Sequence, residues 1–118
     1  LGRMLDRADP ITAIFALNDY IAIALIRCAL DCGVKVPQQL SVIGFDNIEL
    51  AQHAEVPLTT VEQNFYQMGY EAARSLVRQV AGDRQSKSEL ITSLPVRIVE
   101  RQSVADLSRA RAQNGKAV

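Results

Sequence analysis

The sequence predicts an α/β domain built on a parallel sheet, and three observations support this fold class. Two short apolar runs, residues 11–17 and 41–45, lack the polar alternation of half-exposed strands, which is typical of strands covered on both faces. Residues 20–30 between them are apolar nearly all round and have the length of a helix. Strand, helix and strand in this order predict a right-handed βαβ unit. At 118 residues, with 48% hydrophobic and 22% charged residues, one ordinary soluble domain is expected.

The first predicted helix is bounded by residues that favour helix ends. Asn18 and Asp19 are both good N-cap residues, and Gly33 supplies a C-terminal stop. A helix that is apolar nearly all round must be covered on several sides. Cys28 and Cys32 lie four apart on one face of it, without a second Cys or His pair, so we expect reduced core cysteines and no metal site.

The second half of the chain predicts two more helices and two more extended segments. Residues 48–54 fit a short helix, and residues 56–61 are extended with a strand at their end. Residues 64–81 carry apolar side chains three or four apart, which predicts an amphipathic helix whose apolar face belongs to the core. Residues 94–101 alternate as a final strand, and Pro95 favours a place at a sheet edge.

Charge and polarity exclude some partners. The chain has 13 basic and 13 acidic residues, so no net positive charge draws it to nucleic acid or to an acidic membrane. No segment reaches the roughly 20 apolar residues of a membrane span. Residues 83–89 are loop-like, and the small, polar and basic tail from residue 102 is expected to be frayed or disordered. Its dispersed cations fit a solvated end: Arg109, Arg111 and Lys116.

Polar residues follow both predicted strands. Asn18 and Asp19 come after the first, and Asp46 and Asn47 after the second. Ligands of parallel α/β sheets bind beyond the carboxyl ends of the strands. A carboxylate accepts hydrogen bonds from hydroxyl groups, whereas an amide donates and accepts, so this edge suits a small polyhydroxylated or heterocyclic ligand. The same residue types also cap helices, and the residues alone leave both interpretations open, with capping favoured for Asp19.

The sequence does not favour catalysis. Its only histidine, His53, lies in a polar segment without a nucleophile elbow, and we expect it at the surface. Glycine-rich nucleotide motifs, HExxH and CxxC are absent from the sequence. We therefore predict that the protein is not an enzyme and uses no cofactor.

Seven stretches match a known family in order and spacing: TAIFALND at 12–19, VP at 36–37, SVIGFDN at 41–47, PLTTV at 57–61, MG at 68–69, LP at 94–95 and RQS at 101–103. Together they resemble the latter part of the effector-binding domain of LacI/GalR transcriptional regulators. The resemblance runs from about Pro10 to Ser103. It implies a periplasmic-binding-protein-like fold of type I, with two Rossmann-like α/β lobes and an effector between them.

The resemblance also implies a division of the chain. Residues 1–61 and 93–103 would belong to the C-terminal lobe of the effector-binding domain. Residues 62–92 would supply a crossover helix of the N-terminal lobe, and residues 104–118 would be a disordered tail. The family's helix-turn-helix, hinge helix and early first-lobe strands are not among these residues. We therefore expect the chain to be part of a longer protein or, alone, to aggregate through uncovered edges and apolar faces.

Site residues carry over from the family position by position. Asp46 resembles the effector-binding carboxylate at the end of the Gly-Phe-Asp strand, and Asn18 resembles the asparagine at the preceding strand end. Gln63 resembles a hinge-region glutamine that reaches the ligand, and Phe65 is a further candidate. The helix after the Asn-Asp pair contributes to the family's dimer interface, where we expect two residues, Ile23 and Arg27.

The resemblance implies a cytoplasmic, dimeric DNA-binding regulator or repressor. A small sugar or related metabolite would change its affinity for operator DNA, which it would bind through an N-terminal helix-turn-helix outside these residues. The alternative is a periplasmic sugar-binding protein of a transport system, which has the same fold and can share the strand ends. The segment PLTTVEQ at 57–63 and the apolar first helix favour the regulator.

Overall fold

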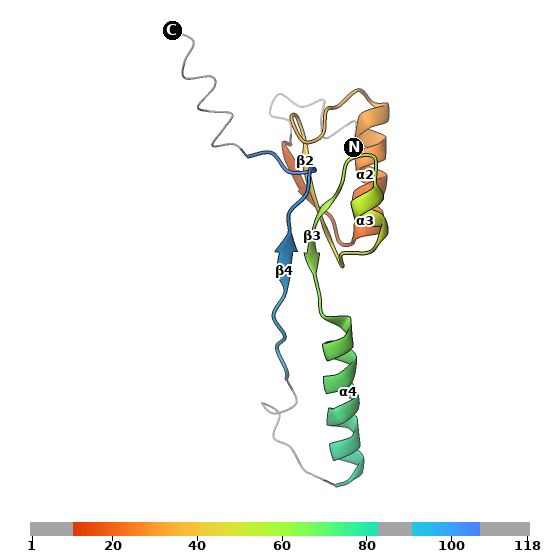
Figure 1. The fold of residues 1–118 in the computed structure, drawn as a ribbon, viewed down its shortest axis with the longest axis vertical. Helices are drawn as coiled ribbons and strands as arrows, with labels where there is room; N and C mark the ends of the chain where they lie inside the picture. Colours follow the sequence, from red (N-terminus) through yellow and green to blue (C-terminus); the bar gives the residue numbers. More distant parts are fainter. Residues whose placement is uncertain (1–10, 83–90, 107–118) are drawn as a thin grey trace. The chain divides into compact units, whose positions relative to one another are not determined.

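The structure is a computed structural model, and it describes residues 11–82 and 91–106. Within them the elements follow the order β1 (Ala13–Phe15), α2 (Asp19–Asp31), β2 (Ser41–Phe45), α3 (Leu50–His53), β3 (Thr59–Glu62), α4 (Phe65–Val80) and β4 (Arg97–Val99) (Figure 1). Two compact units result. The first takes its described residues from Leu1–Val61 and Ile98–Val118, and the second from Glu62–Arg97.

A four-stranded sheet in the order β1-β2-β3-β4 is the framework of the first unit. β1 pairs with β2 in parallel, with Ala13 opposite Ser41, and β2 pairs with β3 in parallel, with Ile43 opposite Thr59. β4 is the end strand beside β3, and its arrow in Figure 1 points opposite to that of β3. The predicted α/β class with parallel strands is confirmed, and so is the edge position of the last strand.

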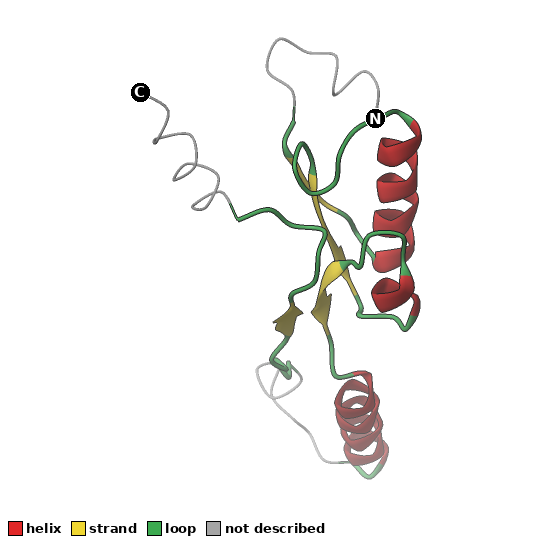
Figure 2. Cartoon of the chain, turned by 45° about the horizontal axis from the view of Figure 1, so that its top comes forward, coloured by secondary structure: helices red, strands yellow, loops and turns green. Residues whose placement is uncertain are grey.

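Helix α2 forms where the sequence predicts it. Asn18 has an extended backbone, and its Oδ1 accepts a hydrogen bond from the backbone N–H of Ile21 at 2.9 Å, which satisfies one of the first-turn donors. The chain leaves the helix through Gly33, whose φ of +76° suits glycine. Figure 2 shows α2 beside the strands. A stripe of small and aliphatic side chains on it is fully buried: Ala22, Ile26 and Ala29.

The expectation that the first strand is covered on both faces and the first helix on several sides is wrong for the described residues. Phe15 is 64% exposed and Leu17 is 81% exposed. Cys28 and Cys32 are exposed thiols, not core residues. The reason is geometric: β1 ends the sheet on one side, and α2 packs through a single stripe. The part of the chain that the structure describes supplies no layer for their other faces.

Helix α4 is confirmed as a helix, but its apolar face is not core within the second unit. Asn64 caps it by accepting from the backbone N–H of Gln67 at 2.9 Å. None of its residues is buried, and Leu76 and Val80 are 61% and 80% exposed. An amphipathic pattern predicts a face that needs a cover, whereas the described residues of this unit do not provide one.

The shorter elements agree with the sequence in kind and differ at their ends. The predicted helix at 48–54 is reduced to α3, and the predicted strand at 94–101 is reduced to β4. β3 occupies the end of the extended segment 56–61, as expected, and extends to Glu62. The expectation that the chain is frayed from residue 102 is wrong for residues 102–106, because Ser103 is fully buried and the backbone N–H of Ala105 donates to the Ser41 hydroxyl at 3.0 Å. The predicted loop at 83–89 and the rest of the tail, from residue 107, lie outside the described residues. Among the helices the structure describes, none has the length and apolar character that crossing a membrane requires.

A buried carboxylate connects three segments of the first unit. Asp19 is fully buried; its Oδ1 accepts from the Thr60 hydroxyl at 2.5 Å, and its Oδ2 accepts from the backbone N–H of Ile48 at 2.9 Å. Gly44 on β2 lies against this carboxylate, because a Cβ there would stand 2.1 Å from Oδ1 and 2.9 Å from Leu58. Asp19 thus ties α2 to β3 and to the turn before α3.

The segment after β4 returns to the sheet through Ser103. Its buried hydroxyl donates to the carbonyl oxygen of Val42 at 2.5 Å and accepts from the backbone N–H of Thr59 at 2.8 Å. The carbonyl of Ser103 accepts from the backbone N–H of Val42 at 2.8 Å. Ser103, the last residue of the RQS motif, therefore completes hydrogen bonds of β2 and β3.

We predict that Gly44→Ala lowers the free energy of unfolding by about 3 kcal/mol, because the new methyl group overlaps a fixed, hydrogen-bonded carboxylate. Urea denaturation followed by circular dichroism measures the change. Gly69→Ala is the matched control, since a Cβ at Gly69 in α4 meets nothing within 4 Å. It should leave stability unchanged or raise it by up to about 1 kcal/mol. Equal losses in the two variants would contradict the close approach of Asp19 to β2.

Candidate functional site

The strand register brings two predicted site residues to one edge of the sheet. β1 and β2 pair with Ala13 opposite Ser41 and Phe15 opposite Ile43. Asn18 follows the carboxyl end of β1, and Asp46 follows the carboxyl end of the neighbouring strand β2. Both residues belong to the first unit and follow the carboxyl ends of parallel strands, where ligands of α/β folds bind.

The turn after β2 has an unusual backbone. Asp46 has φ of 115° and Asn47 has φ of 54°, which is the left-handed region that side chains other than glycine rarely occupy. Such residues cost about 1–3 kcal/mol each, and they persist where the surroundings hold them, often at functional sites. The backbone N–H of Asp46 donates to the carbonyl of Val61 at 2.8 Å, which fastens the turn to β3. The Asp-Asn pair is the sequence signal that could have indicated this turn, because these residues tolerate the left-handed region best.

Asn18 and Asp19 have different roles in the structure. Asn18 caps α2 through Oδ1, which leaves its Nδ2 group as the donor that a ligand could use. Asp19 is fully buried, and both of its oxygens accept hydrogen bonds within the protein. The capping interpretation therefore holds for Asn18 without excluding a ligand, whereas Asp19 is structural.

Gln63 and Phe65 belong to the second unit, at the junction of β3 and α4. Both line a cavity of about 650 Å³ within that unit, together with Glu62, Gln67 and residues 94–97. Phe65 is 56% exposed, so an aromatic face is available there. An ion pair between Arg97 and Glu62 lies in the cavity lining, and the hydrogen bond to Glu62 raises the pKa of the Arg97 guanidinium.

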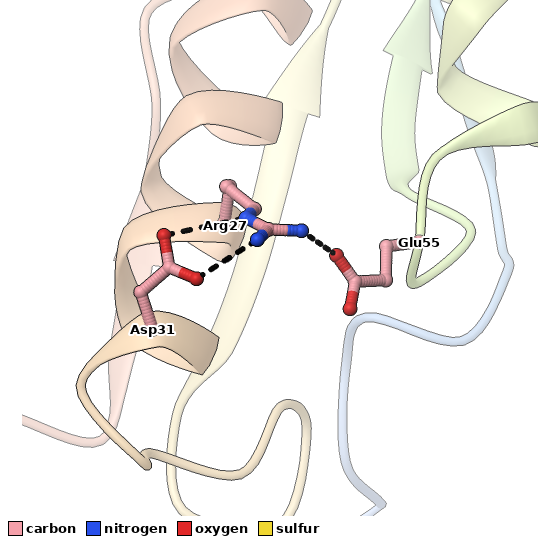
Figure 3. A network of polar contacts seen from close by, with 3 residues as sticks. All are labelled: Arg27, Asp31 and Glu55. Carbon is pink, nitrogen blue, oxygen red and sulfur yellow. Dashed lines mark hydrogen bonds and ion pairs between the residues drawn. The ribbon is translucent and has the colours of Figure 1, made fainter.

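The two residues expected at a dimer interface lie on α2. Ile23 is half-buried and packs against the core. Arg27 is exposed and binds two carboxylates: its Nη2 lies 3.1 Å from Asp31 and its Nη1 lies 2.9 Å from Glu55 (Figure 3). The hydrogen bond and charge of Asp31, followed by those of Glu55, raise the pKa of Arg27. This network joins α2 to the segment after α3 at the protein surface.

The described residues do not assemble a metal centre. In residues 11–82 and 91–106, no group of three His, Cys, Asp or Glu side chains is placed to hold an ion. His53 is exposed, as predicted. The basic residues Arg109, Arg111 and Lys116 lie outside the described residues.

The carboxyl edge of the parallel sheet is the candidate ligand site that this fold offers. The sequence matches the periplasmic binding protein-like domain over residues 2–104, and the chain belongs to this family. The predicted fold family is thereby confirmed.

The similar curated proteins are transcriptional regulators. The chain is 47% identical over 107 residues to the HTH-type transcriptional regulator DegA of Bacillus subtilis, covering 91% of this chain and 31% of DegA. It is 38% identical over 99 residues to the HTH-type transcriptional regulator CelR of Thermobifida fusca, covering 84% of this chain and 27% of CelR. The chain thus spans about a third of the length of these relatives or less.

Solved structures give the same assignment. A putative transcriptional regulator LacI from Bacillus cereus subsp. cytotoxis has a TM-score of 0.79 and 32% identity, covering 88% of this chain and 36% of that one. The lac repressor dimer bound to operator and the anti-inducer ONPF has a TM-score of 0.72 and 28% identity, and the match covers 80% of this chain and 32% of the repressor chain. A CelR-cellobiose complex has a TM-score of 0.68 and 34% identity, and the match covers 84% of this chain and 30% of the CelR chain. The resemblance to LacI/GalR regulators is confirmed, and these relatives are regulators rather than enzymes.

Two substitutions at Asn18 separate its capping role from its donor group. Asn18→Ala removes the cap and should lower the free energy of unfolding by about 1 kcal/mol. Asn18→Asp retains an accepting oxygen, so its stability should stay within about 0.5 kcal/mol of the wild type although the amide donor is lost. Thermal and urea denaturation of both variants test this. Equal destabilisation by both would mean that the cap is not what Asn18 contributes to stability.

Proposed function

We propose that this chain is the effector-sensing part of a LacI-type transcriptional regulator, in which a bound small molecule changes the affinity of a dimer for operator DNA. The observation that carries the proposal is the strained Asp46–Asn47 turn, which is anchored to Val61 at the carboxyl end of β2, next to the strand whose carboxyl end Asn18 follows. A strained acidic turn at the ligand edge of this fold is a feature that binding, rather than stability, explains.

Four residues are proposed to contact the effector. Asp46 would accept hydrogen bonds from ligand hydroxyls, and Asn18 would donate through Nδ2. Gln63 would offer an amide and Phe65 an apolar ring from the cavity of the second unit. Sugars suit this set, because they combine paired hydroxyls with apolar ring faces. The complex of the similar regulator CelR with cellobiose supports a sugar or related metabolite as the effector class.

The two units are proposed to belong to different lobes. Residues 1–61 and 93–103 would form part of the C-terminal lobe, and residues 62–92 would supply the crossover helix of the N-terminal lobe. The boundary of the two compact units at 61/62 supports the first limit of this division, whereas their second boundary lies at 97/98 and leaves residues 93–97 with the second unit. The uncovered apolar face of α4 supports it too, because a lobe of the complete protein would cover that face.

Operator binding, dimerisation and a cytoplasmic location are proposals about the whole protein. The names of the similar HTH-type regulators support a DNA-binding domain, and the lac repressor dimer on its operator supports a two-fold assembly. We propose that Ile23 and Arg27 on α2 belong to the dimer interface. The similarity to regulators favours this function over the alternative of a periplasmic carrier.

Asp46→Ala in the full-length protein should weaken effector binding by about 1.5–3 kcal/mol, the scale of hydrogen bonds to a charged group. Isothermal calorimetry with ribose, glucose, sucrose and cellobiose provides the measurement. The same substitution should raise, by the same factor, the sugar concentration that is needed to change the affinity for a DNA sequence selected from a random pool.

Glu49→Ala is the control for Asp46→Ala. Glu49 is an exposed carboxylate three residues further on, and its side chain makes no capping hydrogen bond. It should bind sugar like the wild type. Unchanged affinity in Asp46→Ala would remove Asp46 from the site. Sugar binding that has no effect on DNA binding would contradict the proposed function as a regulator.

Arg27→Glu should weaken the dimer of the full-length protein at least about tenfold, because it reverses a charge at the proposed interface and opposes Asp31 and Glu55. Sedimentation velocity over a dilution series measures the dimer dissociation constant. Arg78→Glu, at the exposed end of α4, is the matched charge reversal and should leave the dimer unchanged. A dimer equally stable in both variants would place the interface elsewhere.

A further inference from the structure

We infer that Arg101 is a positioning residue of the effector site, whose guanidinium holds the strained Asp46–Asn47 turn in its binding geometry. The inference rests on the proposed function, in which Asp46 contacts the effector. It adds a residue far away in the sequence that acts on the effector through Asp46.

The guanidinium of Arg101 joins the turn to the start of β3. Nη2 donates to Oδ1 of Asn47 at 2.7 Å, and Nη1 donates to the carbonyl oxygen of Leu58 at 2.7 Å. The backbone N–H of Arg101 donates to the Thr59 hydroxyl oxygen at 2.9 Å, which fixes the base of the side chain. Arg101 is half-buried, so water competes less for these charge-assisted bonds than at an exposed site.

Three consecutive residues of the turn are each anchored to a different segment. The backbone N–H of Asp46 is held by the carbonyl of Val61 at 2.8 Å. Asn47 is held through its side chain by Arg101, and the backbone N–H of Ile48 is held by Asp19 at 2.9 Å. A strained conformation persists only when its surroundings over-determine it, so each anchor contributes to the left-handed backbone of Asp46 and Asn47.

Arg101 differs from the other two anchors in what it restrains. Val61 and Asp19 hold backbone amides at the two ends of the turn, whereas Arg101 holds the side chain of its middle residue. Without Arg101, the turn keeps the bonds at its two ends and loses the charge-assisted bond to the side chain of Asn47. The Asp46 carboxylate then samples more orientations, and ordering it again on binding lowers affinity.

The planar fork of arginine is what this position requires. One guanidinium reaches two acceptors on separate segments, the Leu58 carbonyl and the Asn47 amide oxygen. A lysine ammonium at the end of a flexible stem keeps the charge and loses the rigid two-point geometry. Arg101→Lys therefore retains part of the positioning and Arg101→Met retains none.

Ser103→Ala is the control that distinguishes positioning of the turn by Arg101 from a purely structural role of Arg101. Ser103 lies two residues away on the same returning segment and also bonds to β3, through the Thr59 N–H, but its partners do not include the turn. Both Arg101→Met and Ser103→Ala should lower stability. Only the loss of Arg101 should change the turn.

The test uses the full-length protein with Arg101→Met, Arg101→Lys and Ser103→Ala. Calorimetry with ribose, glucose, sucrose and cellobiose gives affinity, and amide hydrogen exchange gives the protection of residues 45–48. We expect Arg101→Met to weaken sugar binding about tenfold and to speed exchange in the turn, with Arg101→Lys between it and the wild type. Ser103→Ala should bind sugar within about twofold of the wild type and leave exchange in the turn unchanged.

The inference is overturned if Arg101→Met and Ser103→Ala weaken binding equally, or if exchange at 45–48 is unchanged in Arg101→Met. Failure of the proposed function has a different signature: none of the four sugars binds the wild type, or Asp46→Ala binds like the wild type. In that event exchange still decides whether Arg101 holds the turn. Faster exchange confined to 45–48 supports the positioning role, and unchanged exchange removes it.

Discussion

The buried carboxylate of Asp19 is the constraint on which the first unit depends. A charge removed from water is tolerated only when hydrogen bonds replace its hydration, and here the Thr60 hydroxyl and the Ile48 amide do so. Each donor comes from a different segment, so the start of α2, the turn before α3 and β3 must meet at one point. The same carboxylate requires glycine at position 44, because β2 passes too close to it for a side chain.

This arrangement also fixes the candidate effector edge. Asn18 precedes Asp19 in the chain and Asp46 lies two residues before Ile48, so the bond from Ile48 to Asp19 couples the two ligand candidates to each other. Arg101 and Val61 restrain the same turn from the β3 side. An edge held in this way requires little ordering when a ligand arrives, which favours affinity. The first unit therefore presents a prepared polar rim, and the second unit presents an amide and an aromatic ring beside its own cavity.

Features set by neighbouring residues could be predicted from the sequence. The caps Asn18 and Asn64, the stop at Gly33 and the parallel strand pairs depend on local signals and on short connections. The exposure of Phe15, of the α4 face and of the two cysteines could not be predicted, because apolar patterning does not show whether a covering layer is present. A helix cap and a buried structural carboxylate also look alike in sequence, which hid the role of Asp19. The bond between Arg101 and Asn47 joins residues 54 positions apart, and no local pattern indicates such a pair.

Because Ser103 lies near the end of the described chain, its bonds to the sheet can form only late in synthesis. Synthesis proceeds from the amino terminus, so β1, β2 and β3 leave the ribosome before α4, and Arg101 and Ser103 leave after it. Until then the Val42 carbonyl and the Thr59 amide lack their native side-chain partner, and Asn47 lacks its guanidinium. A nascent chain that stops within α4 has its three parallel strands but not the bonds that complete them. Co-translational maturation of the candidate effector edge therefore ends only when the last strand and the residues after it have been added.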